Sequence, residues 1–166
     1  RIAAPIVAEL NAAGFAVESL DDLRRSGRPY PEAVPILLAW LPRIDAVDVK
    51  ESLVRTLSVP WAKGLATRVL LNEFSKTPKE EEMLRWAIGN AIEVIADGSI
   101  AEDLHRIVSD PENGTARQMF VLALAKAKHP ANVAVLLPLL NHDDVAGQAA
   151  IALGKRENLT VRELAQ

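Results

Sequence analysis

The segment DVAGQAAIALG, residues 144–154, decides the fold of this chain. Its apolar residues recur at steps of three and four, which is the spacing of one face of an α-helix. Alanine and glycine nevertheless stand at many positions where a core helix normally carries bulky side chains. Small side chains allow two helix backbones to approach closely. The segment therefore predicts a helix that packs tightly against its neighbours.

Three earlier segments share this pattern: DVKESLVRTLS at 48–58, MLRWAIGNAIE at 83–93 and TARQMFVLALA at 115–125. The four copies start 35, 32 and 29 residues apart, intervals that are typical of helical repeats. When they are aligned, one apolar column contains Leu53, Ile88, Phe120 and Ala149. A second, four positions later, contains Leu57, Ile92, Leu124 and Leu153. Between them runs a column of small residues, Thr56, Ala91, Ala123 and Ala152. The columns predict a buried face that includes a close helix contact.

Another amphipathic segment precedes each copy, at 31–44, 61–76, 99–110 and 131–143. Antiparallel helix pairs repeated in tandem stack into an α-solenoid, because each pair buries its apolar face against the next. We therefore expect an all-α protein, an α-solenoid of about four to five antiparallel helix pairs. It forms a single domain over residues 1–166.

The parts of this domain differ in regularity. Residues 1–30 form an irregular N-terminal pair, 31–156 hold the repeats, and 157–166 are a C-terminal cap or the start of a further helix. Thr77-Pro78-Lys79-Glu80 has the composition of a helix start, with Thr77 as the cap.

The composition is that of a folded protein without a strong positive field. Hydrophobic residues make up 49% of the chain, which excludes a disordered protein. The formal charge is −3, which disfavours a grip on nucleic acid or on an anionic membrane. The absence of cysteine fits a reducing compartment, and no apolar run reaches the roughly 18 residues of a membrane span. We expect a soluble, cytoplasmic protein and, since the sequence begins with Arg1 rather than Met, a fragment of a longer chain.

The repeats resemble short bacterial HEAT repeats, also called PBS-lyase-like repeats. The shared motif is an apolar helix, a turn with Asp, then Val-Arg and a small-residue helix ending in Ala-Leu-Gly. It stands here as VLLPLLNHDDVAGQAAIALGKR at 135–156 and, less cleanly, as AVPILLAWLPRIDAVDVKESLVRTLS at 33–58. The resemblance covers about residues 31–156 and implies an armadillo-like superhelix that acts as a scaffold or adaptor, more often than as an enzyme. The fourth copy departs from the motif, because Ala146 stands where the arginine belongs.

A basic residue occupies that motif position in the first three copies, as Lys50, Arg85 and Arg117. One basic side chain per repeat would line up along the inner helices as a ladder that grips an acidic peptide or a phosphate backbone. The alternative is that each one bonds an aspartate of an inter-helix turn and fixes the repeat geometry. Asp48, Asp110 and Asp144 are the candidate partners.

Trp86 is the second candidate for a binding role, because tryptophan and arginine are common at binding hot spots. It shares a column with Glu51, Gln118 and Gly147, so it is expected outside the main buried stripe, whereas Trp40 and Trp61 are expected in the core. Asn90, one turn later, can bond a bound main chain, or simply be solvated. The candidate binding residues on the concave face are Lys50, Arg85, Trp86, Asn90, Arg117 and Gln118.

Nothing in the pattern indicates catalysis, a metal or a cofactor. His105, His129 and His142 form no pair at helical spacing, and neither a phosphate loop nor a nucleophile elbow is present. We therefore expect a non-catalytic scaffold that binds a protein or peptide on its concave inner-helix surface, with no cofactor. Two alternatives remain open. One is a HEAT-like alkylpurine DNA glycosylase or other nucleic-acid binder, and the other is a bilin lyase-type protein that handles a chromophore.

Overall fold

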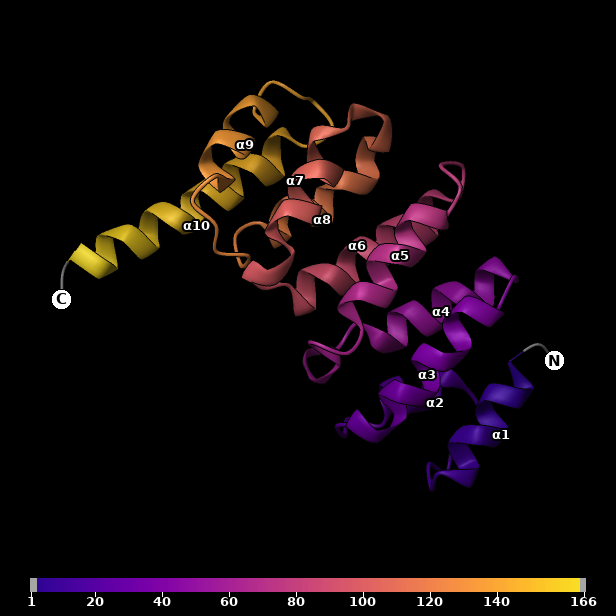
Figure 1. Ribbon diagram of the computed structural model, residues 1–166. Coiled ribbons are helices and arrows are strands. Elements are labelled where there is room, and N and C mark those ends of the chain that lie inside the picture. The colour runs from indigo at the N-terminus through magenta and orange to yellow at the C-terminus, as the bar shows by residue number, and fades with distance from the viewer. Residues whose placement is uncertain (1–2, 165–166) are drawn as a thin grey trace. The chain divides into compact units, whose positions relative to one another are not determined.

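The computed structural model describes the backbone of residues 3–164 and the side chains of residues 3–155. Within these limits every regular element is helical and no strand occurs, which confirms the all-α prediction (Figure 1). None of the helices in this part of the chain is long and apolar enough to cross a membrane. The helices form two compact units, Arg1–Ile95 and Ala96–Gln166. The repeat pattern had indicated no boundary at this point.

Unit 1 contains six α-helices in the described residues: α1 (Ala4–Ala12), α2 (Leu20–Arg25), α3 (Val34–Trp40), α4 (Val47–Leu57), α5 (Thr67–Lys76) and α6 (Glu82–Ile95). Short 3-10 turns lie at Pro31–Ala33, Leu41–Arg43 and Pro60–Ala62. Helix α4 is central to the unit and packs against α2, α3 and α6. Helix α1 packs on α3, and α5 packs on α6.

Two predicted features of unit 1 are wrong in detail. The segment 61–76 is not one helix, because Gly64 adopts a φ of 81° and breaks the chain direction between Pro60–Ala62 and α5. Thr77 does not cap α6, which begins at Glu82. Thr77 instead ends α5, where its Oγ1 donates a hydrogen bond to the carbonyl of Glu73. The helix therefore starts one turn later than the capping pattern predicts.

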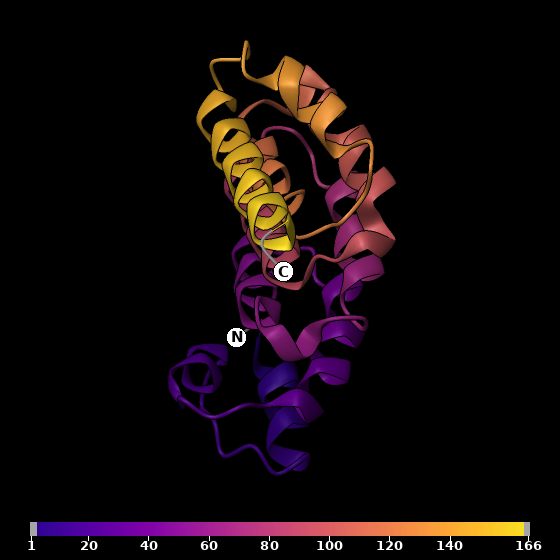
Figure 2. The ribbon, with the colours of Figure 1, turned by 90° about the vertical axis from the view of Figure 1, so that its left-hand side faces the viewer.

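Unit 2 contains four α-helices in the described residues: α7 (Ala101–Ser109), α8 (Arg117–Ala123), α9 (Asn132–Leu139) and α10 (Ala146–Leu164). The 3-10 turns Gly98–Ile100 and Pro111–Ala116 precede α7 and α8. Helix α8 packs on α7 and α10, while α9 packs on α7 and α10. Helix α10 runs without a break from Ala146 to Leu164 (Figure 2), so residues 157–164 continue this helix rather than start another element.

The aligned columns lie in the core as the sequence predicts. Thr56, Ala91, Ala123 and Ala152 are all fully buried, and so are Leu53, Ile88, Phe120 and Ala149. Burial of the small-residue column fits a position between packed helices, since α4 packs on α6 in unit 1 and α8 packs on α10 in unit 2. In the second apolar column only Leu153 is half-exposed.

One loop contact in unit 2 brings two stretches of backbone close together. Gly98 lies against the main chain of Lys128, so that a Cβ at residue 98 would be 2.9 Å from the Lys128 carbonyl oxygen. The backbone of the turn before α7 and the loop after α8 therefore touch without a side chain between them.

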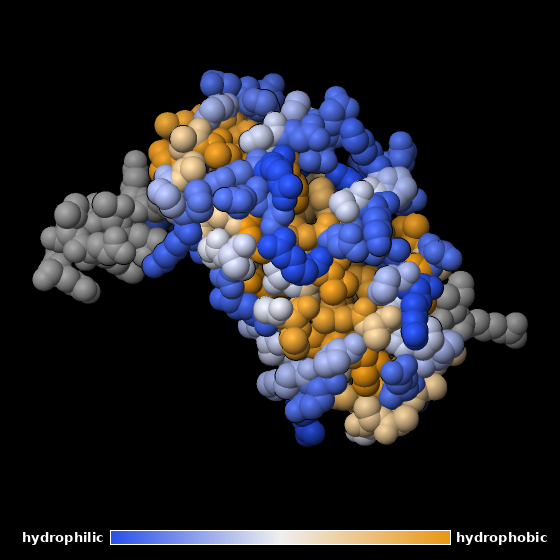
Figure 3. All heavy atoms as spheres, viewed as in Figure 1, coloured by the Kyte–Doolittle hydropathy of each residue, from blue (hydrophilic) through white to orange (hydrophobic). Residues whose placement is uncertain are grey.

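Helix α9 leaves an apolar face in solvent. Val133, Leu137 and Leu140 follow one another at steps of four and three and are 42%, 52% and 41% exposed. Figure 3 shows this apolar surface over α9. The helix is apolar on nearly all sides, so packing within unit 2 covers only part of what its sequence presents.

Candidate functional site

Two members of the basic column are buried and bonded within their own helix pairs. Arg85, at 5% exposure, donates from Nη1 to the carbonyl oxygens of Thr77 at 2.8 Å and Phe74 at 3.2 Å. Its guanidinium also lies over the Phe74 ring, 4.0 Å from the centroid. Phe74 and Thr77 lie at the C-terminal end of α5, where carbonyls lack helical partners and the helix dipole is negative. Arg85 therefore joins the end of α5 to the first turn of α6.

Arg117 repeats this arrangement in unit 2 and adds an ion pair. It is 1% exposed and donates to the carbonyl of Val108 at 2.9 Å, near the end of α7. Its Nη2 donates to Asp144 Oδ2 at 2.6 Å, one of the aspartate contacts considered from the sequence. Gln118 donates to the main-chain carbonyl of Asp144 at 2.9 Å. Arg117 and Gln118 thus fix the turn before α10 onto the start of α8.

Lys50 lies in a more open position. Its Nζ donates to Glu73 Oε1 at 2.5 Å, with 17% of the lysine side chain and 5% of the glutamate side chain exposed. The pair lies in a pocket of about 360 Å³ whose lining carries charges of both signs. Three equivalent positions therefore have different partners, and no ladder of three exposed cations exists.

The exposed face of α6 carries the remaining candidates of unit 1. Trp86 is half-buried, and Met83, one turn before it, is 60% exposed. Asn90, one turn after it, donates from Nδ2 to Ser58 Oγ at 3.0 Å at the end of α4. On the neighbouring α4, Arg55 Nε donates to Glu51 Oε1 at 2.8 Å. The neighbouring helices thus carry an apolar row on α6 and a surface ion pair on α4.

The two other tryptophans are not fully buried. Trp40 is half-buried, and its Nε1 donates to Glu9 Oε2 at 2.7 Å. Trp61 is half-buried as well and meets the Tyr30 ring edge-on at a centroid distance of 5.1 Å. Both therefore link elements within unit 1 at the edge of its core.

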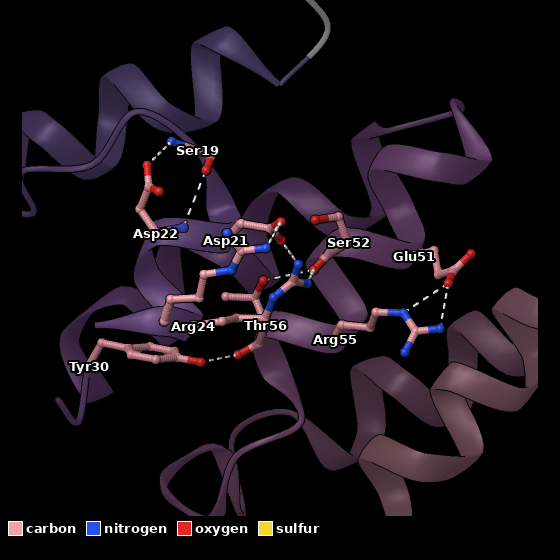
Figure 4. A network of polar contacts seen from close by, with 10 residues as sticks. Ser19, Asp21, Asp22, Arg24, Tyr30, Glu51, Ser52, Arg55 and Thr56 are labelled. Carbon is pink, nitrogen blue, oxygen red and sulfur yellow. Dashed lines mark hydrogen bonds and ion pairs between the residues drawn. The ribbon is translucent and has the colours of Figure 1, made fainter. Parts of the chain in front are cut away.

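A network of polar contacts ties α2 to α4 (Figure 4). Arg24 pairs with Asp21 and donates to the main-chain carbonyl of Ser52 at 3.1 Å. The Tyr30 hydroxyl donates to the Thr56 carbonyl at 2.9 Å. Burial raises the pKa of Tyr30, although the nearby Arg24 opposes the shift. The network holds α2 in place by bonds to carbonyls of α4.

A capping box starts α2. The Ser19 Oγ accepts the Asp22 N–H at 3.2 Å, and the Asp22 carboxylate accepts the N–H groups of Glu18 and Ser19, each at 2.9 Å. The Glu18 N–H in particular lowers the pKa of Asp22, because it bonds the charged form. The start of α2 is therefore a well-defined wall for the groove beside it.

That groove lies between α1, the start of α2 and α4, and has a volume of about 610 Å³. Its lining is more apolar than polar and includes Ala4, Val7 and Ala8 of α1 and Val49 of α4. The charged lining residues are all acidic: Glu18, Asp21 and Asp48. Sequence patterns could not identify this groove, because its residues come from three helices, of which α1 and α2 lie in the irregular N-terminal part and α4 belongs to the first repeat copy.

A histidine pair in unit 2 was also missed. The rings of His105 and His129 meet edge-to-face with centroids 5.1 Å apart. His105 Nε2 lies 2.6 Å from Oδ1 of the buried Asn132, whose Nδ2 donates to the carbonyls of Leu124 and Ala127. Since both Asn132 donors are used, its Oδ1 accepts from His105. Within residues 3–155, no three histidines or carboxylates gather as a metal site requires.

Comparison of the chain with protein-family models, with curated proteins and with solved structures gives no match.

Proposed function

We propose that the chain is a non-catalytic scaffold built of HEAT-type helix pairs, and that it binds a segment of a partner protein on the exposed face of α6. The single observation that carries this proposal is the pairing of Met83, 60% exposed, with the half-buried Trp86 on successive turns. Large apolar side chains kept in solvent at adjacent positions are typical of interaction surfaces.

The surroundings of Trp86 support a protein partner. Asn90 holds α6 against the end of α4 through Ser58, so the apolar row lies on a fixed helix face rather than on a loop. The Glu51–Arg55 pair on α4, the helix packed against α6, offers both an acceptor and a donor. An apolar centre with a polar rim is the usual composition of a protein interface.

Arg85 and Arg117 support the fold of this scaffold rather than its contacts with a partner. Each is buried, and each bonds carbonyls at the end of the preceding helix. We assign binding to Trp86 and Met83, with Asn90 positioning the helix, and assign stability to the two arginines.

The test uses a peptide library selected for binding to the full chain. The selected peptides are measured against Trp86→Ala and Met83→Ser variants, and each change is expected to weaken binding roughly tenfold or more, as truncation of a hot-spot residue does. Leu65→Ser is the matched control, because Leu65 is 56% exposed in the same unit but lies in the turn before α5.

Three outcomes contradict the proposal: no peptide is enriched, binding survives both α6 changes, or Leu65→Ser reduces binding as strongly. Duplex DNA is titrated in the same assay. Binding of DNA that depends on Trp86 would favour a nucleic-acid role instead.

A further inference from the structure

The groove between α1, α2 and α4 is a second surface, distinct from the face of α6. One wall is α1, whose Ala4 and Ala8 are exposed and lie one turn apart, with the half-buried Val7 between them. Val49 and Ser52 of α4 form the opposite side, and Leu20 of α2 closes the end. The volume of about 610 Å³ lies within the range of ligand-binding clefts.

The polar groups in the groove are of two kinds. Asn11 and Ser19 already bond their own loop: the Asn11 amide bonds both main-chain groups of Val17, and Ser19 caps α2. Glu18 and Asp48 differ from these, since neither carboxylate is paired with any basic side chain among residues 3–155. Two acidic groups therefore face the groove without a counter-charge from the described part of the chain.

The third carboxylate, Asp21, is compensated by basic neighbours. Asp21 is paired with Arg24, and Arg25 Nη2 lies 3.6 Å from its second oxygen. Arg24 is turned toward α4, where it bonds the Ser52 carbonyl (Figure 4). Neither arginine is among the residues that line the groove. The opening of the groove is therefore apolar at its walls and acidic at its rim.

We propose that this groove binds an amphipathic helix of a partner protein that presents small aliphatic side chains flanked by lysine or arginine. A helix fits because the walls are themselves helices, and alanines at adjacent turns permit close approach of another helix. Flanking cations fit because Glu18 and Asp48 lack a basic partner among the described residues.

The negative charge at the rim of the groove distinguishes this cationic partner from anionic ones. An anionic membrane surface and a nucleic-acid backbone both bring negative charge, which the carboxylates of Glu18 and Asp48 repel. The partner is therefore a protein segment with positive charge near its apolar face.

The probe is a fluorescently labelled helical peptide of alanine, leucine and lysine, measured by anisotropy against the full chain. Its counterpart carries glutamate at each lysine position. We expect the lysine peptide to bind at least about tenfold more tightly than the glutamate peptide, and its affinity to fall as salt is raised.

Two sets of variants locate the binding. Ala8→Gln puts a longer side chain into the groove and is expected to weaken binding roughly tenfold, whereas Ala12→Gln, also exposed on α1 but outside the lining, leaves binding within about twofold. Glu18→Gln with Asp48→Asn is expected to weaken it roughly tenfold as well. Glu32→Gln with Glu80→Gln removes the same charge from exposed sites elsewhere in unit 1 and has little effect.

The proposal is overturned if both peptides bind equally, if Ala8→Gln binds as the parent does, or if the two charge-removing pairs have the same effect. A melting curve for each variant confirms that the fold is retained. Trp86→Ala is measured with the lysine peptide too. This variant is expected to bind the lysine peptide as the parent does. A negative result for the groove proposal can therefore be told apart from a negative result for the proposed function of the α6 face.

Discussion

At the scale of single residues, the two buried arginines show how one side chain stabilises a helix pair. Arg85 and Arg117 each lie at the start of the second helix and bond carbonyls near the end of the first. Burial of a guanidinium is costly unless its donors find acceptors. Arg85 meets that condition with main-chain carbonyls at the end of α5, and Arg117 meets it with the Val108 carbonyl and the Asp144 carboxylate.

Truncation of Arg117 is expected to be strongly destabilising. Arg117→Ala leaves Asp144 and the Val108 carbonyl without their donor and should lower the free energy of unfolding by about 3 to 5 kcal/mol. Arg117→Lys keeps the charge but lacks the planar guanidinium, so its free energy of unfolding should lie between those of the parent and Arg117→Ala. Urea denaturation measures both, and an alanine variant as stable as the parent would show that the bonds contribute nothing.

Tyr30 gives the stability of the chain a defined dependence on alkaline pH. Burial raises the pKa of Tyr30 in the folded state. The contribution of this shift to the free energy of unfolding is fully present below the unfolded pKa of about 10, and it is lost as the pH rises from there through the higher folded pKa. Tyr30→Phe removes this dependence together with the bond to the Thr56 carbonyl. The stability advantage of the parent over Tyr30→Phe should therefore narrow as the pH rises through this window.

Two measurements check this. Denaturation of parent and variant is followed from neutral to alkaline pH. Tyrosinate absorbance of the folded parent reports the group directly, because Tyr30 is the only tyrosine in the sequence. Ionisation at the ordinary tyrosine pKa would contradict the shift.

At the scale of helices, the small-residue column bears on how closely the helices pack. Ala123 of α8 and Ala152 of α10 are fully buried, and these two helices are in contact. Because protein interiors are close-packed, added volume at such a contact moves the backbones apart.

Ala123→Leu and Ala152→Leu should each lower the free energy of unfolding by about 1 to 3 kcal/mol through overpacking. Ala150→Leu is the matched control, since Ala150 is exposed on α10, and it should change stability by less than about 0.5 kcal/mol. Thermal melts compare the three. Equal melting temperatures for Ala152→Leu and Ala150→Leu would show that residue 152 does not lie at a tight contact.

Helical periodicity predicts this column because burial repeats with the turn of the helix, whatever the partner is. The break at Gly64 and the late start of α6 were not predictable in the same way, since the sequence 61–76 is apolar at helical steps and Thr77 has a cap-forming side chain. The basic column was found by spacing. Of its partners, Asp144 was among the candidates from the sequence. The helix-end carbonyls that bond Arg85 and Arg117, and the Glu73 carboxylate that bonds Lys50, are not identified by any spacing rule.

At the scale of the whole chain, the helices group into Arg1–Ile95 and Ala96–Gln166. The repeat pattern continues across residue 95 and does not reveal this boundary. It indicates which face of each helix is buried, and it does not indicate how many neighbouring helices each helix contacts. The groove and the α6 face both belong to the first unit, and the exposed row on α9 belongs to the second.

The two units should respond separately to a local change. Arg117→Lys weakens contacts inside unit 2, so amide hydrogen exchange should accelerate in residues 96–164 more than in residues 3–95. Exchange is followed by mass spectrometry on the full chain under native conditions. A uniform acceleration over both ranges would show that the chain opens as one cooperative unit.

The contact between Gly98 and Lys128 also has an evolutionary consequence. A methyl group at residue 98 would meet a main-chain oxygen, which cannot swing aside as a long side chain can. A Cβ at Gly154 of α10, in contrast, would have no atom within 4 Å, so this position can accept alanine without a steric clash. Any descendant or ancestor that keeps this loop packing must keep glycine at residue 98. That residue is therefore a diagnostic position for recognising distant homologues after the rest of the sequence has diverged.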